Sequence, residues 1–119
     1  MAAFQRGIDL LNRQEYFEAH EVLEDVWRAA PSAHKRFLQG LVQVAVAFHH
    51  YTHANTTGAQ SVLRRAINNL SADRPPYATF DVDGLLALLC AWERVIIGIS
   101  TVIPAAPNIQ LSPQQSGQG

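Results

Sequence analysis

The sequence predicts a single all-α domain of about five helices. Apolar residues recur every three or four positions through five segments, and no strand is needed to account for the pattern. Polar turns or prolines separate these segments. A length of 119 residues suits one hydrophobic core, and 48% apolar with 16% charged residues is typical of a globular protein. We therefore expect antiparallel helical hairpins in one compact domain.

The first two predicted helices are separated by a short polar turn. Residues 4–12 repeat large apolar side chains at helical spacing, and the polar residues 12–14 end this helix. Residues 15–30 form a second apolar stripe. Their acidic residues crowd the first half and Arg28 lies in the last turn, as the helix dipole favours, and Pro31 ends the helix.

The third predicted helix is the central one. Ser32 is its expected N-cap, and residues 33–54 are apolar over such a broad face that they require burial on more than one side. Asn55 opens a polar turn, after which residues 59–71 form a fourth helix with one polar face. We expect this fourth helix to be half exposed.

The fifth predicted helix follows a loop that contains two consecutive prolines, which cannot lie inside a helix. Asp81 or Asp83 is the expected cap, and residues 84–101 are apolar over more than half of the helix surface. Such a surface exceeds what one neighbouring hairpin covers in so small a domain. It predicts a homodimer through helix 84–101.

Composition and charge exclude several functional classes. Nine scattered Lys and Arg residues and a net charge of -1 argue against binding to nucleic acid. Glu93 and Arg94 lie in the middle of the apolar stretch 85–103 and exclude a membrane span. A lone Cys90, expected in the core, excludes an internal disulfide and indicates a reducing compartment, so we expect a cytoplasmic protein.

The last part of the chain differs in composition from the rest. From residue 104 on it is rich in Pro, Gln, Ser and Gly and has no periodicity. Such a composition is typical of a disordered segment. We therefore expect a helical domain at residues 1–103 and a flexible tail at residues 104–119.

Polar residues interrupt the apolar patterns of the second and third predicted helices. If these helices form an antiparallel hairpin, their polar stripes face one another across one seam. The expected cluster consists of His20, Glu21, Glu24, Gln39, Gln43 and His50. Two interpretations remain open: the side chains pair with one another and only fix packing, or His20, Glu24 and His50 hold a divalent metal. His49 and His53, four residues apart, could bind a metal at the surface, but a solvated helix end is the more common explanation.

Several of these residues also carry a family resemblance. The stretch YFEAHEVLEDVWR at 16–28, followed by FLQGLVQVA at 37–45, His50 and NTTGA at 55–59, resembles the domain-of-unknown-function 309 family over about the first 70 residues. The resemblance implies a compact all-helical domain and no particular activity. It places the family's motif on Glu18, His20, Glu21, Glu24, Trp27, Gln39, Gly40, His50, Asn55, Gly58 and Ala59, of which Trp27, Gly40, Asn55 and Gly58 are expected to be structural.

Three functions remain open on the sequence alone. The first is a binding module for an unidentified small molecule or protein. A weaker similarity of residues 12–31 and 55–75 to the hairpins of tetratricopeptide repeats agrees with peptide binding. The second is a metal-dependent hydrolase that uses His20, Glu24 and His50. The third is a structural subunit in which the polar cluster only fixes packing.

Overall fold

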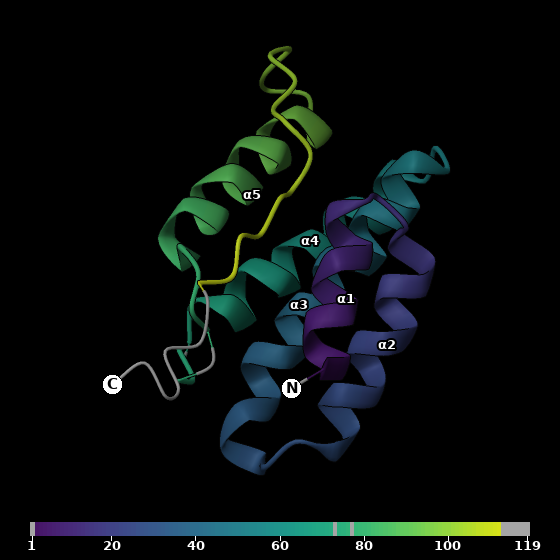
Figure 1. Cartoon of the computed structure of the whole chain (residues 1–119). Helices are drawn as coiled ribbons and strands as arrows, with labels where there is room; N and C mark the ends of the chain where they lie inside the picture. Colours follow the sequence, from purple (N-terminus) through teal and green to yellow (C-terminus); the bar gives the residue numbers. More distant parts are fainter. Residues whose placement is uncertain (1, 73, 77, 113–119) are drawn as a thin grey trace.

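A computed structural model describes residues 2–72, 74–76 and 78–112, and it shows five helices (Figure 1). They are α1 (Ala2–Asn12), α2 (Tyr16–Ala29), α3 (Ser32–Thr52), α4 (Thr56–Leu70) and α5 (Val82–Ile96). Within the described residues there is no β-strand. The predicted all-α fold is therefore confirmed.

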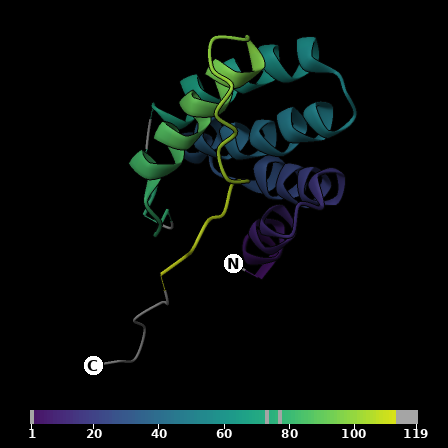
Figure 2. The ribbon, with the colours of Figure 1, turned by 90° about the horizontal axis from the view of Figure 1, so that it is seen from above.

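The helices pack mainly against their neighbours in sequence, α1 on α2, α2 on α3, α3 on α4 and α4 on α5. Figure 2 shows α1 to α4 side by side in chain order, and α5 packs on α4. The helix α3 buries nine of its 21 residues, whereas α2 buries three of 14. The structure thus places α3 at the centre, as the breadth of its apolar face predicts.

Two glycines allow neighbouring helices to approach closely. A Cβ atom on Gly40 of α3 would lie 2.8 Å from Cγ of Leu70 on α4. A Cβ atom on Gly7 of α1 would lie 2.6 Å from Cδ2 of Leu23 on α2. Because both leucines are completely buried, neither has free space to move into. Glycine at these two positions therefore sets the spacing of two helix pairs.

Side-chain caps begin the two later helices. The Asn55 carboxamide accepts a hydrogen bond from the backbone N–H of Gly58 at 2.9 Å, and the Asp81 carboxylate accepts one from Gly84 at 2.9 Å. Each bond satisfies a backbone N–H group that has no partner inside its helix. Of the two aspartates expected to cap α5, Asp81 is the one that does so.

Two expectations about single residues are wrong. Ser32 is the first helical residue of α3 rather than its cap; Pro31 occupies the cap position, and its carbonyl accepts a hydrogen bond from His34 N–H at 2.9 Å. Cys90 is exposed rather than buried. It follows the buried Leu89 on α5, and one residue turns a helix by about 100°. Cys90 therefore points away from the core.

The helix α5 ends at Ile96, five residues before the expected end at 101. Gly98 has a φ of +88°, its N–H bonds to the carbonyl of Val95 at 3.1 Å, and the N–H of Ile99 bonds to that of Arg94 at 2.8 Å. This is the Schellman arrangement, in which a left-handed glycine ends a helix. The apolar pattern continues past Gly98, but the helix does not.

Beyond this stop, residues 97–103 form an exposed apolar segment, which we call the linker. Its four large apolar side chains, those of Ile97, Ile99, Val102 and Ile103, are 41–76% exposed. Of the apolar residues that the sequence assigns to helix 84–101, the two with large exposed side chains, Ile97 and Ile99, therefore lie in the linker. Among the described helices, none combines the length and apolar character needed to cross a lipid bilayer.

Residues 104–112, which we call the docked segment, return along the bundle (Figure 1, yellow). Ile109 is 3% exposed and belongs to the core, and the indole N–H of Trp92 donates to the carbonyl of Ala105 at 2.8 Å. This part of the chain therefore differs from the flexible tail expected from residue 104 on. Residues 113–119 of that tail lie outside the described residues.

The side chain of Asn12 holds this segment at its middle. Its carboxamide accepts a hydrogen bond from Ile109 N–H at 2.7 Å and donates one to Ile109 C=O at 2.8 Å. One side chain thus satisfies both backbone groups of one residue, as a neighbouring strand would. The first helix and the end of the described chain are joined directly.

The burial of Ile109 predicts that the docked segment contributes to stability. The substitution Ile109→Ala should lower the free energy of unfolding by about 2–5 kcal/mol, because it removes buried methyl groups and leaves a cavity. Urea unfolding measures this loss. Gln110→Ala, at the exposed neighbouring position, is the control and should change little; equal effects of the two variants would contradict the docking.

Candidate functional site

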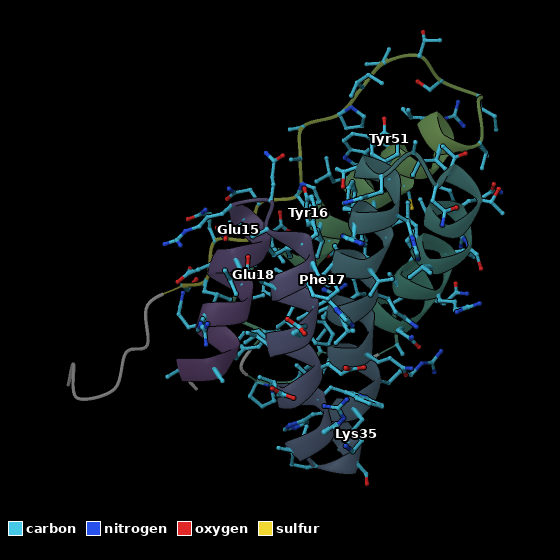
Figure 3. The ribbon with its side chains drawn as sticks, turned by 90° about the vertical axis from the view of Figure 1, so that its right-hand side faces the viewer. Glu15, Tyr16, Phe17, Glu18, Lys35 and Tyr51 are labelled. Carbon is cyan, nitrogen blue, oxygen red and sulfur yellow. The ribbon has the colours of Figure 1, made fainter. Side chains whose placement is uncertain are left out.

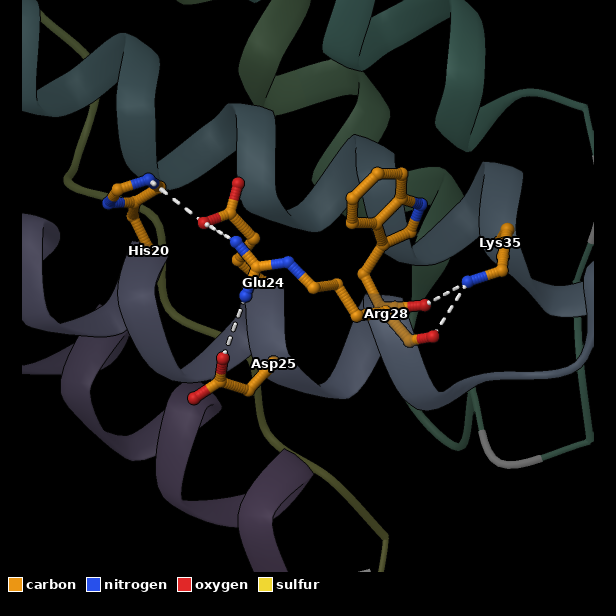
Figure 4. Close-up of polar contacts among 6 residues, drawn as sticks. His20, Glu24, Asp25, Arg28 and Lys35 are labelled. Carbon is orange, nitrogen blue, oxygen red and sulfur yellow. Dashed lines mark hydrogen bonds and ion pairs between the residues drawn. The ribbon is translucent and has the colours of Figure 1, made fainter.

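The predicted His and Glu residues of α2 lie on a partly exposed surface (Figure 4). His20 Nε2 is 4.0 Å from Glu24 Oε1, and the two side chains are 27% and 34% exposed. The same Glu24 oxygen accepts a hydrogen bond from Arg28 Nη2 at 3.0 Å. The principal partner of Glu24 is therefore Arg28, one turn further along the same helix.

The polar residues of α3 pair with other parts of the chain. Gln43 Oε1 accepts a hydrogen bond from the side-chain amide of Asn69 on α4 at 2.8 Å. His50 Nδ1 lies 3.2 Å from the side-chain nitrogen Nδ2 of Asn55. Both thus bond away from α2. Glu21 and Gln39 are exposed.

The expected buried network of His20, Glu24, Gln43 and His50 does not form, and this expectation is wrong. Among the described residues, no polar or charged residue is buried. The spacing places Gln43 and His50 on one face of α3, but the helix has neighbours on two sides. Their partners come from α4 and its cap rather than from α2.

The proposed metal ligands are only partly brought together. His20 and Glu24 approach each other, whereas His50 contacts Asn55. In the ranges that the structure describes, no three His, Cys, Asp or Glu side chains form a group that could hold a metal ion. A divalent-metal site of His20, Glu24 and His50 stays a prediction that requires His50 to leave Asn55.

Trp27, the last residue of the α2 motif, lies at a helix end closed by Lys35. The Lys35 ammonium donates to the carbonyls of Trp27 at 2.7 Å and Arg28 at 3.0 Å, and it lies 5.1 Å from the centre of the Trp27 ring (Figure 4). The Trp27 carbonyl also accepts a hydrogen bond from Ala30 N–H at 3.2 Å, so Lys35 adds a charged donor to the carbonyls at the end of α2. The Trp27 indole N–H, by contrast, is buried without a hydrogen-bond partner among the described residues.

Three histidines lie near Phe17, whose side chain Figure 3 labels at the start of α2. The exposed Phe17 ring lies 5.7 Å from that of His20 and 5.6 Å from that of His49, and the rings of His49 and His53 are 4.2 Å apart. Neither His49 nor His53 is among the site residues expected from the sequence. Their four-residue spacing is the signal that points to this contact.

An open apolar groove of about 470 Å³ lies where the start of α1, the end of α2 and the start of α3 meet. We call it the N-terminal groove. Its lining residues are Ala3, Phe4, Asp25, Val26, Ala29, Ala30, Pro31, His34 and Leu38. The sequence alone does not reveal this groove, because a hollow of this kind arises from small side chains at three helix ends that only the fold brings together.

One wall of the N-terminal groove belongs to the most acidic helix. Five of the ten acidic residues of the chain lie within residues 15–25. Glu18, Glu21 and Asp25 are exposed at helical spacing on α2, and Asp25 also lines the groove. Asp25 accepts a hydrogen bond from Arg28 at 3.0 Å, which is an exposed ion pair of little strength. The groove is thus apolar inside and negatively charged along one edge.

Comparison with known proteins agrees with the resemblance read from the motif. The family model described as "Domain of unknown function (DUF309)" matches residues 4–62. Over these residues, the chain belongs to that family. All the residues that line the N-terminal groove except Ala3 lie inside the matched part.

Two curated relatives are similar to this chain over 61 residues each. "Uncharacterized protein YpuF" of Bacillus subtilis (strain 168) is 39% identical, and an "Uncharacterized protein" of Aquifex aeolicus (strain VF5) is 28% identical. Each match covers 50% of this chain, but only 35% and 18% of the two relatives. The similarity thus spans well under half of either relative. No solved structure is significantly similar to the chain.

The separate partners of Glu24 and Gln43 predict different costs of mutation. Glu24→Gln removes an exposed ion pair and should lower the free energy of unfolding by less than about 1 kcal/mol. Gln43→Leu leaves the amide of Asn69 without its acceptor and should cost about 1–3 kcal/mol. Urea unfolding of both variants gives the order. A larger loss of unfolding free energy for Glu24→Gln than for Gln43→Leu would support the buried network that the sequence predicts.

The crowded imidazoles predict a loss of stability in acid. Burial, together with the charges of His53, His50 and His20, lowers the pKa of His49 from its usual 6.5. The folded state then binds fewer protons than the unfolded state as the pH falls through this value, so protonation favours unfolding.

The free energy of unfolding should therefore decrease between about pH 7 and about pH 5, and it should decrease less in His49→Gln. Urea titrations at several pH values measure both slopes. His34→Gln, which changes a histidine at the opposite end of α3, is the matched control. Equal slopes for wild type and His49→Gln would show that His49 does not sense this pH range.

Proposed function

We propose that this domain is a protein-binding module whose N-terminal groove takes an amphipathic helix with basic residues beside its apolar face. The single observation that supports this function is the groove itself, which is apolar, open and bordered by the acidic face of α2. Binding of an apolar helix face in a groove is a common mode of peptide recognition.

The size and lining of the groove fit this ligand. A volume of about 470 Å³ lies within the range of ligand pockets, about 300–1,000 Å³. Ala29 and Ala30 leave room for large side chains of a partner, and Phe4 and Leu38 offer apolar contact. A Lys or Arg of the partner would meet Asp25, which gives up only an exposed ion pair in exchange. Charge therefore orients the partner, and apolar contact supplies affinity.

The metal-dependent hydrolase is the weaker alternative, because the three proposed ligands do not converge. A structural subunit would not need an open apolar groove. The exposed thiol of Cys90 agrees with a reducing compartment, so we keep a cytoplasmic location in this proposal.

Binding of a labelled model peptide tests the function. The probe is a fluorescein-labelled peptide with leucines on one helical face and lysines beside them. We expect Ala29→Trp, which fills the groove, to raise the dissociation constant at least about tenfold. Asp25→Lys should weaken binding and reduce its dependence on salt. Fluorescence anisotropy measures both effects.

Two controls distinguish binding in the groove from nonspecific binding of the peptide. Ala87→Trp and Asp83→Lys make the same changes at exposed positions of α5 and should leave binding unchanged. A peptide of the same composition in scrambled order should bind more weakly. If the helical peptide binds wild type and Ala29→Trp equally, the groove is not its site. Binding of a small apolar dye in the groove without any binding of the peptide would assign the groove to a small molecule.

A further inference from the structure

The linker 97–103 exposes most of the large apolar side chains that the structure leaves in water. Among the described residues, five large apolar side chains are exposed, and four of them, Ile97, Ile99, Val102 and Ile103, lie in the linker. Val102 is 76% exposed. A contiguous apolar segment of this kind is typical of a surface that another molecule covers.

The docked segment that follows the linker is held as an extended peptide is held by a receptor. Pro107 and Ile109 are buried, whereas Asn108 and Gln110 between and after them are exposed. This alternation is that of a strand with one face inward. No helix or sheet of the segment's own supports it among the described residues.

The polar contacts along the docked segment go largely to its main chain. Asn12 binds both backbone groups of Ile109, and Trp92 donates to the carbonyl of Ala105. Ser112 N–H donates to the carbonyl of Thr79 at 2.8 Å. None of these contacts requires that the segment come from the same chain as the residues that hold it.

We propose that two copies of this chain exchange their docked segments. The segment 104–112 of each copy then lies against Asn12 and Trp92 of the other, and the two linkers run side by side across a twofold axis. Exchange of an identical element costs little, because every contact within the segment's site is kept. The dimer additionally buries the apolar side chains of the linker, because the linker of each copy packs against the linker of the other.

The observations favour a second copy over other occupants. Complementarity between segment and site already exists in the chain, so no new recognition surface is needed. The exposed apolar residues lie in the connection that must open for exchange, and Gly98 at its start tolerates backbone angles that other residues avoid. A foreign peptide would not account for the apolar linker, since it would occupy only the site of the docked segment.

The first test is the mass of the full chain in solution. Light scattering should show a rise from the monomer mass toward twice that mass between micromolar and near-millimolar concentration. Val102→Asp combined with Ile103→Asp should abolish this rise without loss of folding, because both residues are exposed in the monomer. Asn108→Asp, at an exposed position of the docked segment, is the control and should dimerise as wild type does.

The second test distinguishes exchange from simple contact between linkers. Two samples of the full chain, labelled at Cys90 with donor and acceptor dyes, are mixed and energy transfer is followed. If segments exchange, transfer appears slowly, and Ile109→Ala accelerates it at least about tenfold, because the segment undocks more easily. Gln110→Ala should leave the rate unchanged.

Two results would overturn the proposal. One is a wild-type chain that stays monomeric at every concentration. The other is a dimer whose mixing rate is the same in wild type and Ile109→Ala, which would mean that the linkers meet without exchange. Neither result depends on the N-terminal groove, so the proposed function is tested separately.

Discussion

The pair of hydrogen bonds between the Asn12 carboxamide and the backbone of Ile109 joins parts of the chain that are 97 positions apart. Each helix otherwise packs on its neighbour in sequence, so nothing in that order brings the two ends of the chain together. The docked segment supplies this connection. It lies against α1 through Asn12 and against α5 through Trp92. Fixing an extended segment costs backbone entropy, which the burial of Pro107 and Ile109 offsets only in part.

Local signals in the sequence predict the helices well, because each signal acts within one turn of the chain. Asn55 and Asp81 satisfy backbone groups three residues away, and the broad apolar face of α3 requires a central position. Gly98 is also a local signal for the end of α5, since it follows the last full turn. The predicted helix is longer because apolar residues continue the pattern after Gly98. A glycine with φ near +90° outweighs such a pattern.

The predictions that the structure contradicts concern features that depend on more than one helix or segment. Helical spacing shows that Gln43 and His50 share a face of α3, but it does not tell which neighbour this face meets, and the neighbour is α4. The docked segment has only two buried apolar side chains, those of Pro107 and Ile109, too few for a periodic signal. The N-terminal groove depends on the fit of three helix ends. The helices and the family motif can therefore be predicted from the sequence, whereas the candidate sites depend on the assembled fold.

The central claim is that the described end of the chain is an integral part of the bundle, held by Asn12. Amide hydrogen exchange at Ile109 tests it most directly, and it is independent of whether the segment comes from the same copy. We expect the Ile109 N–H to exchange about as slowly as the amide of the buried Leu41 in α3. In Asn12→Ala this protection should fall while that of Leu41 changes less. Exchange of Ile109 at the rate of an unstructured peptide in the wild-type chain would contradict the account.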